Sequence, residues 1–116
     1  MDVLHCSFCG GAVRLASARC PVDGARLAAT PRDPMIGRVV GGERPYRIHA
    51  VERDDGLGRV YRARSPEREV TVHILYGDLA VEPQAHEAFR SATAGALDAG
   101  TTSAGLPFAV RPVYLS

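Results

Sequence analysis

The most informative absence in this 116-residue sequence is that of lysine, since all fourteen basic residues are arginine. Without lysine, any mechanism that needs a catalytic amine is excluded. The formal net charge is only +1, so no strong overall field favours nucleic acid or a membrane surface. No apolar run approaches the roughly 20 residues of a membrane-spanning helix, and the chain does not start with an export signal. We therefore expect a cytoplasmic protein without membrane contact.

Cysteine is also scarce, and its three copies all lie near the start of the chain. Cys6 and Cys9 have the spacing of a zinc knuckle and are followed by glycine. Cys20 is followed at the same distance by Asp23 and another glycine, so Asp23 stands where a fourth cysteine would be expected. In a chain without an export signal, this pattern favours metal over disulfides. We predict one structural Zn²⁺ held by Cys6, Cys9, Cys20 and Asp23.

Two alternatives to this ligand set are open. His5 is a rival fourth ligand, although its place directly beside Cys6 makes the ion hard to reach without distorting the knuckle. In the other alternative, Asp23 forms only an Asx-turn and the cysteines are free thiols. A catalytic zinc is not expected, because no glutamate or histidine pair accompanies the cysteines to act on a bound water.

A change in composition divides the chain into two parts. Residues 1–29 hold all the cysteines and form the expected zinc ribbon, residues 30–34 form a proline-containing linker, and residues 35–116 form a second domain. The expected fold is α+β, in which the zinc ribbon precedes a small antiparallel sheet with one packed helix. The expected strands cover residues 46–52, 58–64, 69–76 and 106–115.

Periodicity orients two of these segments. In residues 69–76, alternation places Val70, Val72 and Ile74 on one face of the sheet and Thr71, His73 and Leu75 on the other. Residues 82–98 have the helical period and are the one expected helix, and residues 100–105 are expected to form a turn. The apolar stripe of the helix consists of Ala85, Ala88, Phe89, Ala92 and Ala96.

Five short motifs follow one another from the end of the linker onward, at residues 33–38, 45–48, 56–64, 70–75 and 105–110. Together with the Cys-Pro-x-Asp-Gly ending of the cysteine segment, they resemble bacterial Ser/Thr protein kinases that carry an N-terminal zinc ribbon. The resemblance implies that the second domain is similar to a kinase N-lobe. Residues 70–75 would then be its third strand, and residues 105–110 the strand that leads to the hinge.

The same resemblance implies that kinase chemistry is lost. In the glycine-rich loop, Arg53 and Asp55 replace the first two glycines of the G-x-G-x-x-G motif. The phosphate-pairing lysine falls at His73, and its helical glutamate partner falls near Ala92. The sequence contains neither an H-R-D nor a D-F-G motif. We therefore expect a degenerate, pseudokinase-like domain that is not an enzyme and has no useful affinity for ATP.

A kinase-like N-lobe without a second lobe leaves an apolar surface for its own residues, a second copy or a partner to cover. We expect a protein-interaction module, an adaptor or regulator in bacterial signalling, whose partner is a response regulator, a small GTPase, a kinase or a scaffold. The competing expectation is a zinc-ribbon regulator that binds nucleic acid through its arginines. The candidate partner-binding residues are Arg59, Arg62, Arg64, Arg68, Phe108 and Tyr114.

Overall fold

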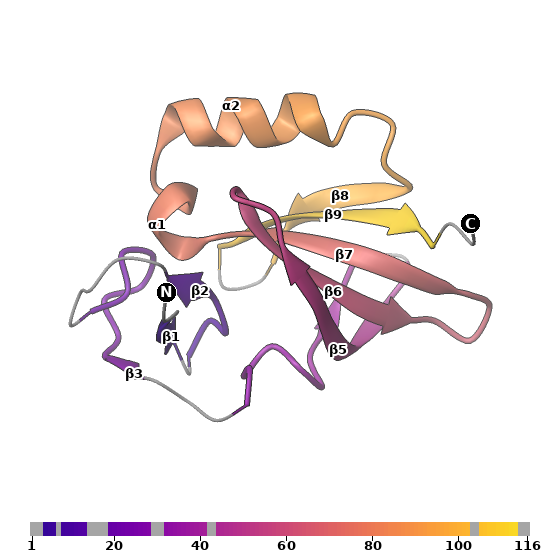
Figure 1. Cartoon of the computed structure of the whole chain (residues 1–116), viewed down its shortest axis with the longest axis horizontal. Helices are drawn as coiled ribbons and strands as arrows, with labels where there is room; N and C mark the ends of the chain where they lie inside the picture. The colour runs from indigo at the N-terminus through magenta and orange to yellow at the C-terminus, as the bar shows by residue number, and fades with distance from the viewer. Residues whose placement is uncertain are drawn as a thin grey trace.

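The chain folds as an α+β structure in which a small antiparallel sheet precedes a larger one (Figure 1). This computed structural model describes residues 4–6, 8–13, 19–28, 32–41, 44–102 and 105–113. Within these ranges, neither of the two helices has the length and apolar character needed to cross a membrane. The combination of antiparallel sheets and helices confirms the expected α+β class. The described residues form two helices instead of one.

The smaller sheet has the strand order β2-β1-β3, and the three cysteines lie in it or in the turns beside it. Its strands are β1 (Leu4–Cys6), β2 (Ala12–Val13) and β3 (Leu27–Ala28). Such short strands form a marginal sheet without further support. We refer to the described residues between 4 and 28 as the cysteine module.

The larger sheet has the strand order β4-β5-β6-β7-β9-β8, with every neighbouring pair antiparallel. Its strands are β4 (Val39–Val40), β5 (Tyr46–Asp54), β6 (Gly58–Arg64), β7 (Glu69–Leu75), β8 (Asp98–Thr101) and β9 (Pro107–Pro112). The four expected strands correspond to β5, β6, β7 and β9. Strand β4 was not expected, and β8 begins within the segment assigned to a helix and a turn.

The hairpin between β5 and β6 is closed by an aspartate. Oδ1 of Asp55 accepts hydrogen bonds from the main-chain amides of Leu57 and Gly58, each at 3.1 Å. Gly58 is required by the neighbouring strand, because a Cβ at this position would lie 2.1 Å from the carbonyl oxygen of Ile74. The main-chain amides of this loop therefore donate hydrogen bonds to the carboxylate of Asp55 within the same loop.

The two helices are α1 (Gly77–Ala80) and α2 (Pro83–Ala92), and α2 lies over the part of the sheet formed by β7, β9 and β8 (Figure 1). The prediction of a helix over residues 82–98 was wrong at its C-terminal end. The Thr93 hydroxyl donates to the carbonyl of Phe89 at 2.7 Å, and Gly95 has a φ of 86°. These two features end the helix and turn the chain toward β8.

The apolar stripe of the helix is narrower than its alanine spacing indicated. Phe89 is buried against Leu75 and Ala109, whereas Ala88 and Ala92 are exposed. One large side chain thus supplies most of the contact between α2 and the sheet. The predicted alternation in β7 is confirmed for its buried face, since Val70, Val72 and Ile74 all belong to the main core.

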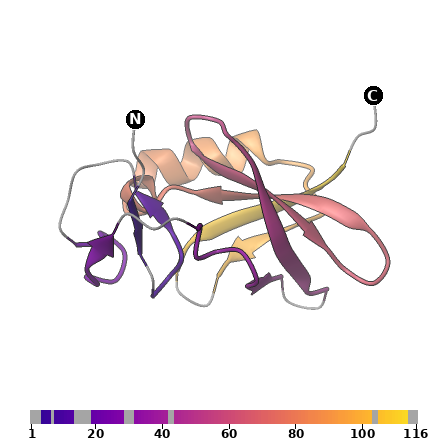
Figure 2. The same ribbon diagram turned by 60° about the horizontal axis from the view of Figure 1, so that its bottom comes forward.

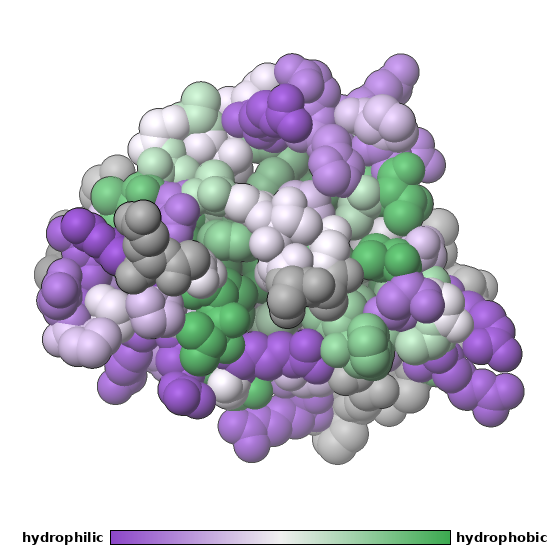
Figure 3. All heavy atoms as spheres, turned by 180° about the vertical axis from the view of Figure 1, so that it is seen from behind, coloured by the Kyte–Doolittle hydropathy of each residue, from purple (hydrophilic) through white to green (hydrophobic). Residues whose placement is uncertain are grey.

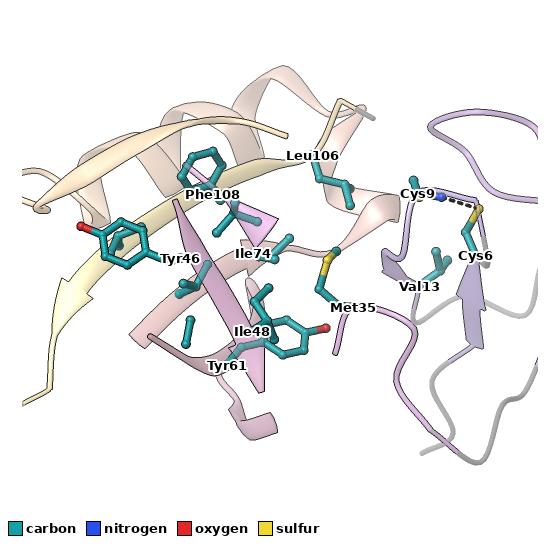
Figure 4. Close-up of a cluster of buried hydrophobic side chains, with 14 of the residues drawn as sticks. Cys6, Cys9, Val13, Met35, Tyr46, Ile48, Tyr61, Ile74, Leu106 and Phe108 are labelled. Carbon is teal, nitrogen blue, oxygen red and sulfur yellow. Dashed lines mark hydrogen bonds between the residues drawn. The ribbon is translucent and has the colours of Figure 1, made fainter. Parts of the chain in front are cut away.

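The main hydrophobic core runs without a break from the larger sheet into the cysteine module. Met35 and Leu106 lie between Cys9 and Val13 on one side and Ile74 and the rest of the sheet core on the other (Figure 4). The cysteine module is packed against the end of the sheet in both ribbon views (Figures 1 and 2). Loss of structure in the module would therefore expose part of the core of the sheet.

Candidate metal centre

Two equivalent turns present the candidate metal ligands. The carbonyl of Cys6 accepts a hydrogen bond from the amide of Gly10 at 2.7 Å, and the carbonyl of Cys20 accepts one from Gly24 at 2.8 Å. Both glycines have positive φ, 79° and 78°, a conformation that favours glycine. Asp23 occupies the place in the second turn that Cys9 occupies in the first. The repeated sequence pattern is therefore a repeated backbone structure.

The ligand atoms of Cys6, Cys9, Cys20 and Asp23 all lie within 4.8 Å of one another. The Sγ atoms of Cys9 and Cys20 are 3.8 Å apart, and Sγ of Cys6 lies 3.3 Å from Oδ2 of Asp23. In a tetrahedral site with metal–sulfur bonds of about 2.3 Å, two sulfur atoms are about 3.8 Å apart, and a sulfur and an oxygen about 3.5 Å. The four groups therefore fit a single tetrahedral ion.

Main-chain amides favour the thiolate form of the three cysteines. The amides of Cys9, Gly11 and Val22 point at Sγ of Cys6, Cys9 and Cys20, respectively, each at 3.4 Å. Burial acts in the opposite direction and raises the pKa of both Cys9 and Cys20 above the ordinary value of 9.0. A bound cation would offset the cost of burying charged sulfur atoms, because cysteine thiols lose their protons and become thiolate ligands when a metal binds.

Asp23 serves as a turn residue and a potential ligand at the same time. Its Oδ1 accepts the amide of Ala25 at 2.8 Å, which is the predicted Asx-turn, while Oδ2 faces Cys6. Burial raises the pKa of Asp23, but hydrogen bonds from Ala25 and the cysteines more than offset this, so its pKa is lower than usual. The carboxylate is thus ionised near neutral pH, and the turn is compatible with metal binding.

His5 does not belong to the cysteine cluster. Its side chain is buried and points toward the larger sheet, where Nε2 lies 3.1 Å from Nη1 of Arg59 and 3.5 Å from Oδ2 of Asp33. Of the two candidates for the fourth ligand, Asp23 is the one whose side chain lies with the three cysteines.

A buried polar junction joins the cysteine module to the sheet at Asp33, a residue expected in the linker. Oδ2 of Asp33 accepts hydrogen bonds from Arg59 at 3.0 Å and from the Tyr61 hydroxyl at 2.7 Å. Oδ1 accepts the amide of Met35 at 2.8 Å. Burial raises the pKa of Asp33, but these bonds and the contact with His5 outweigh it and lower the pKa to about 2. Sequence reasoning missed this junction, because nothing local marks Asp33 as buried.

The arginines proposed as a basic patch are largely paired within the chain. Arg59 donates to Asp33 and Asp54, and Arg62 donates to Glu52 and Glu69. Arg64 lies 3.7 Å from Glu69, and Arg68 is exposed at the turn between β6 and β7. Arg59 is mostly buried, with 14% of its side chain exposed. The four residues therefore do not form one unpaired positive surface.

The two apolar candidates for partner binding differ in their placement. Phe108 is buried, with 5% of its surface exposed, and lies in the core of the larger sheet. Tyr114 lies outside the described residues. Phe108 could therefore contact a partner only through the small exposed part of its side chain.

His73, where the kinase resemblance would place a lysine, is paired with the loop that would cover the phosphates. Its Nε2 lies 2.9 Å from Oδ2 of Asp55, and its ring packs edge-on against Phe89 at 5.1 Å. Burial lowers the pKa of His73, and the nearby Asp55 only partly offsets that effect. The His73 side chain is therefore paired with a carboxylate of the loop between β5 and β6.

Comparison with protein-family models, with curated proteins and with solved structures finds no match to this chain, so its residues and their geometry alone carry the functional argument.

Proposed function

We propose that the protein is a non-catalytic protein-interaction module, stabilised by one structural zinc ion and built like a degenerate kinase N-lobe. The metal part of this proposal rests on the closed set of three thiolates and one carboxylate. Such a set suits Zn²⁺ in a structural site, whereas a catalytic zinc keeps a coordination position for water. The four ligands leave no such position.

The kinase-like part of the proposal is supported by the order of the elements. Strands β5, β6 and β7, the helices α1 and α2, and strands β8 and β9 follow one another, and this order is compatible with such a lobe. The pairing of His73 with Asp55 supports the loss of phosphate binding. By analogy with that family, bacterial signalling is the setting that we propose.

One observation carries the interaction role. The two edge strands of the larger sheet, β4 and β8, line the same hollow of about 780 Å³. Edge strands expose main-chain hydrogen-bonding groups that natural proteins normally cover, charge or pair. A hollow bounded by two such edges suits an extended binding partner, because the main-chain groups of an added strand can pair with those of an edge.

The interaction role is tested by capture on immobilised zinc-loaded protein from a nuclease-treated lysate of the native cells. We expect one or a few proteins to be retained in amounts comparable to the bait and to persist at moderately high salt. The competing nucleic-acid function predicts the opposite pattern. In that case nucleic acid is retained without nuclease, and retention falls steeply with salt because each phosphate contact releases counterions.

Nucleotide binding is expected to be absent at physiological concentrations. Calorimetric titration with ATP and magnesium should show no saturable heat, because Asp55 would repel the phosphates and His73 cannot replace lysine. The double change Asp55→Gly and His73→Lys is a useful comparison. If the resemblance to a kinase N-lobe is correct, this variant should gain measurable affinity. Low-micromolar binding of ATP by the unchanged protein would contradict the proposal.

A further inference from the structure

We propose that the hollow between β4 and β8 binds an extended peptide segment of the partner, which adds to the larger sheet as a strand along β8. This inference rests on the proposed interaction role. β-strand addition to an exposed sheet edge is a common mode of peptide recognition, in which main-chain hydrogen bonds supply affinity and side-chain pockets supply specificity.

The two edge strands of the larger sheet, β4 and β8, both border the hollow. Within the described part of the chain, β8 pairs only with β9, and β4 pairs only with β5. The walls approach each other at one end, where a Cβ on Gly41 would lie 3.4 Å from Oδ2 of Asp98. The hollow of about 780 Å³ is within the usual range of ligand pockets, about 300–1,000 Å³.

The hydrogen-bonding phase of β8 determines which main-chain groups face the hollow. The amide of Thr102 donates to the carbonyl of Leu106 at 2.8 Å, so this residue faces β9. Alternation in an antiparallel ladder then directs the main-chain groups of Ala99 and Thr101 away from β9. The amide of Ala99 contacts the carboxylate of its neighbour Asp98 at 2.9 Å. The Ala99 amide is thus already paired with Asp98, and an added strand would pair with the carbonyl of Ala99 and the main-chain groups of Thr101.

The hollow combines a few exposed apolar side chains with a larger polar surface, which suits a strand with one apolar and one polar face. Val39 and Leu97 are among the few large hydrophobic residues that are exposed, at 50% and 48%, and they lie on opposite walls. Tyr46 and Phe108 are buried beneath them and form the floor. On the face of the molecule seen from behind, hydrophobic and weakly polar residues gather at the centre, with hydrophilic residues around them (Figure 3).

Two charged side chains at the hollow indicate which residues the bound peptide should carry. Arg44 lies on the β4 side and Asp98 on the β8 side. Arg44 is exposed and makes no ion pair with a described residue. A segment that alternates apolar, preferably β-branched, residues and carries a carboxylate opposite Arg44 would complement both the apolar walls and this charge. This is the occupant to which the geometry points.

The test uses the zinc-loaded full chain and a phage-displayed library of random linear peptides. We expect the selected peptides to share alternating β-branched residues and an acidic residue. Replacing Val39 and Leu97 together by serine should weaken their binding by about tenfold or more, which corresponds to about 1.4 kcal/mol. The matched control replaces Val51 and Val81, which are 39% and 52% exposed and lie outside the hollow, and should leave affinity unchanged.

Two further variants address the hollow and its charge. Gly100→Val should block peptide binding without unfolding the protein, because a Cβ there would lie at an ordinary contact distance of 3.5 Å from Phe108. Arg44→Glu should weaken acidic peptides and favour versions in which lysine replaces the acidic residue. The inference is overturned if no peptide is selected, or if the Val39/Leu97 and control pairs have equal effects. Undiminished capture of a native partner by the Val39/Leu97 variant would overturn it while leaving the proposed function intact.

Discussion

Purified protein is expected to contain about one zinc ion per chain, and Cys9→Ser is expected to reduce this content to nearly none. Cys9 is 1% exposed and lies beside Cys20 in the core, so its loss removes one of four ligands from a closed site. Zinc binding at small structural sites contributes on the order of 10 kcal/mol to folding. We therefore expect chelation or Cys9→Ser to unfold the cysteine module and to lower the melting temperature of the whole chain.

The fourth ligand is tested by a pair of variants. Asp23→Ala should weaken zinc affinity strongly in a chelator competition, whereas His5→Gln should leave stoichiometry unchanged because His5 faces Arg59. Elemental analysis measures the stoichiometry, and calorimetric melting measures the stability. A metal-free protein whose melting temperature is insensitive to chelators would contradict the zinc proposal. The reverse pattern in the two variants would assign the fourth position to His5.

Asp33→Asn is expected to cause the second largest loss of stability. The substitution keeps the size of the side chain but removes the charge that faces Arg59 and His5 in a mostly buried site, where the Asp33 side chain is 3% exposed. Breaking one partner of a buried ion pair costs about 3–5 kcal/mol, because the other charge remains without compensation. Asp54→Asn is the matched control. This substitution also removes a partner of Arg59. Because the Asp54 side chain is 44% exposed, the loss of stability should be smaller than for Asp33→Asn. Urea denaturation measures both.

The same carboxylate should make stability depend on pH in the acid range. The pKa of Asp33 is about 2 in the folded state, against an ordinary value of 3.8. A lowered pKa means that the stabilisation is fully present above about pH 4 and is lost as the pH falls toward 2. A difference of this size corresponds to about 2 kcal/mol. Because zinc is also released in acid, the quantity to compare is the slope of stability against pH in the wild type and in Asp33→Asn. Equal slopes would contradict this assignment.

Much of the local structure was predictable because it depends on short-range patterns. The spacing of Cys6, Cys9, Cys20 and Asp23 specified two equivalent turns, since the glycine after each turn allows the positive φ that closes it. Alternation in β7 indicated which side chains face the main core. These features require only that neighbouring residues satisfy their own backbone geometry and burial.

Other features depended on pairs of residues that are distant in the sequence. Strand β8 has a composition poor in strand-forming residues, and it exists because β9 provides its hydrogen-bonding partner. Asp33 is an ordinary linker residue until Arg59 and Tyr61 approach it. The positive charge of the apparent basic cluster is partly offset for the same reason, because Glu52 and Glu69 lie on the neighbouring strands β5 and β7 and pair with Arg62.

The sequence by itself determined the candidate metal ligands, the four principal strands and their inward faces. Only the tertiary structure placed Asp23, and not His5, beside the three cysteines, ended α2 at Ala92, and joined the cysteine module to the sheet through one core. It also brought the two edge strands to the same hollow. The physical reason is that burial, charge pairing and open edges are properties of the assembled chain. They arise when the cost of ordering the chain is offset by contacts between distant segments, and no local pattern records them.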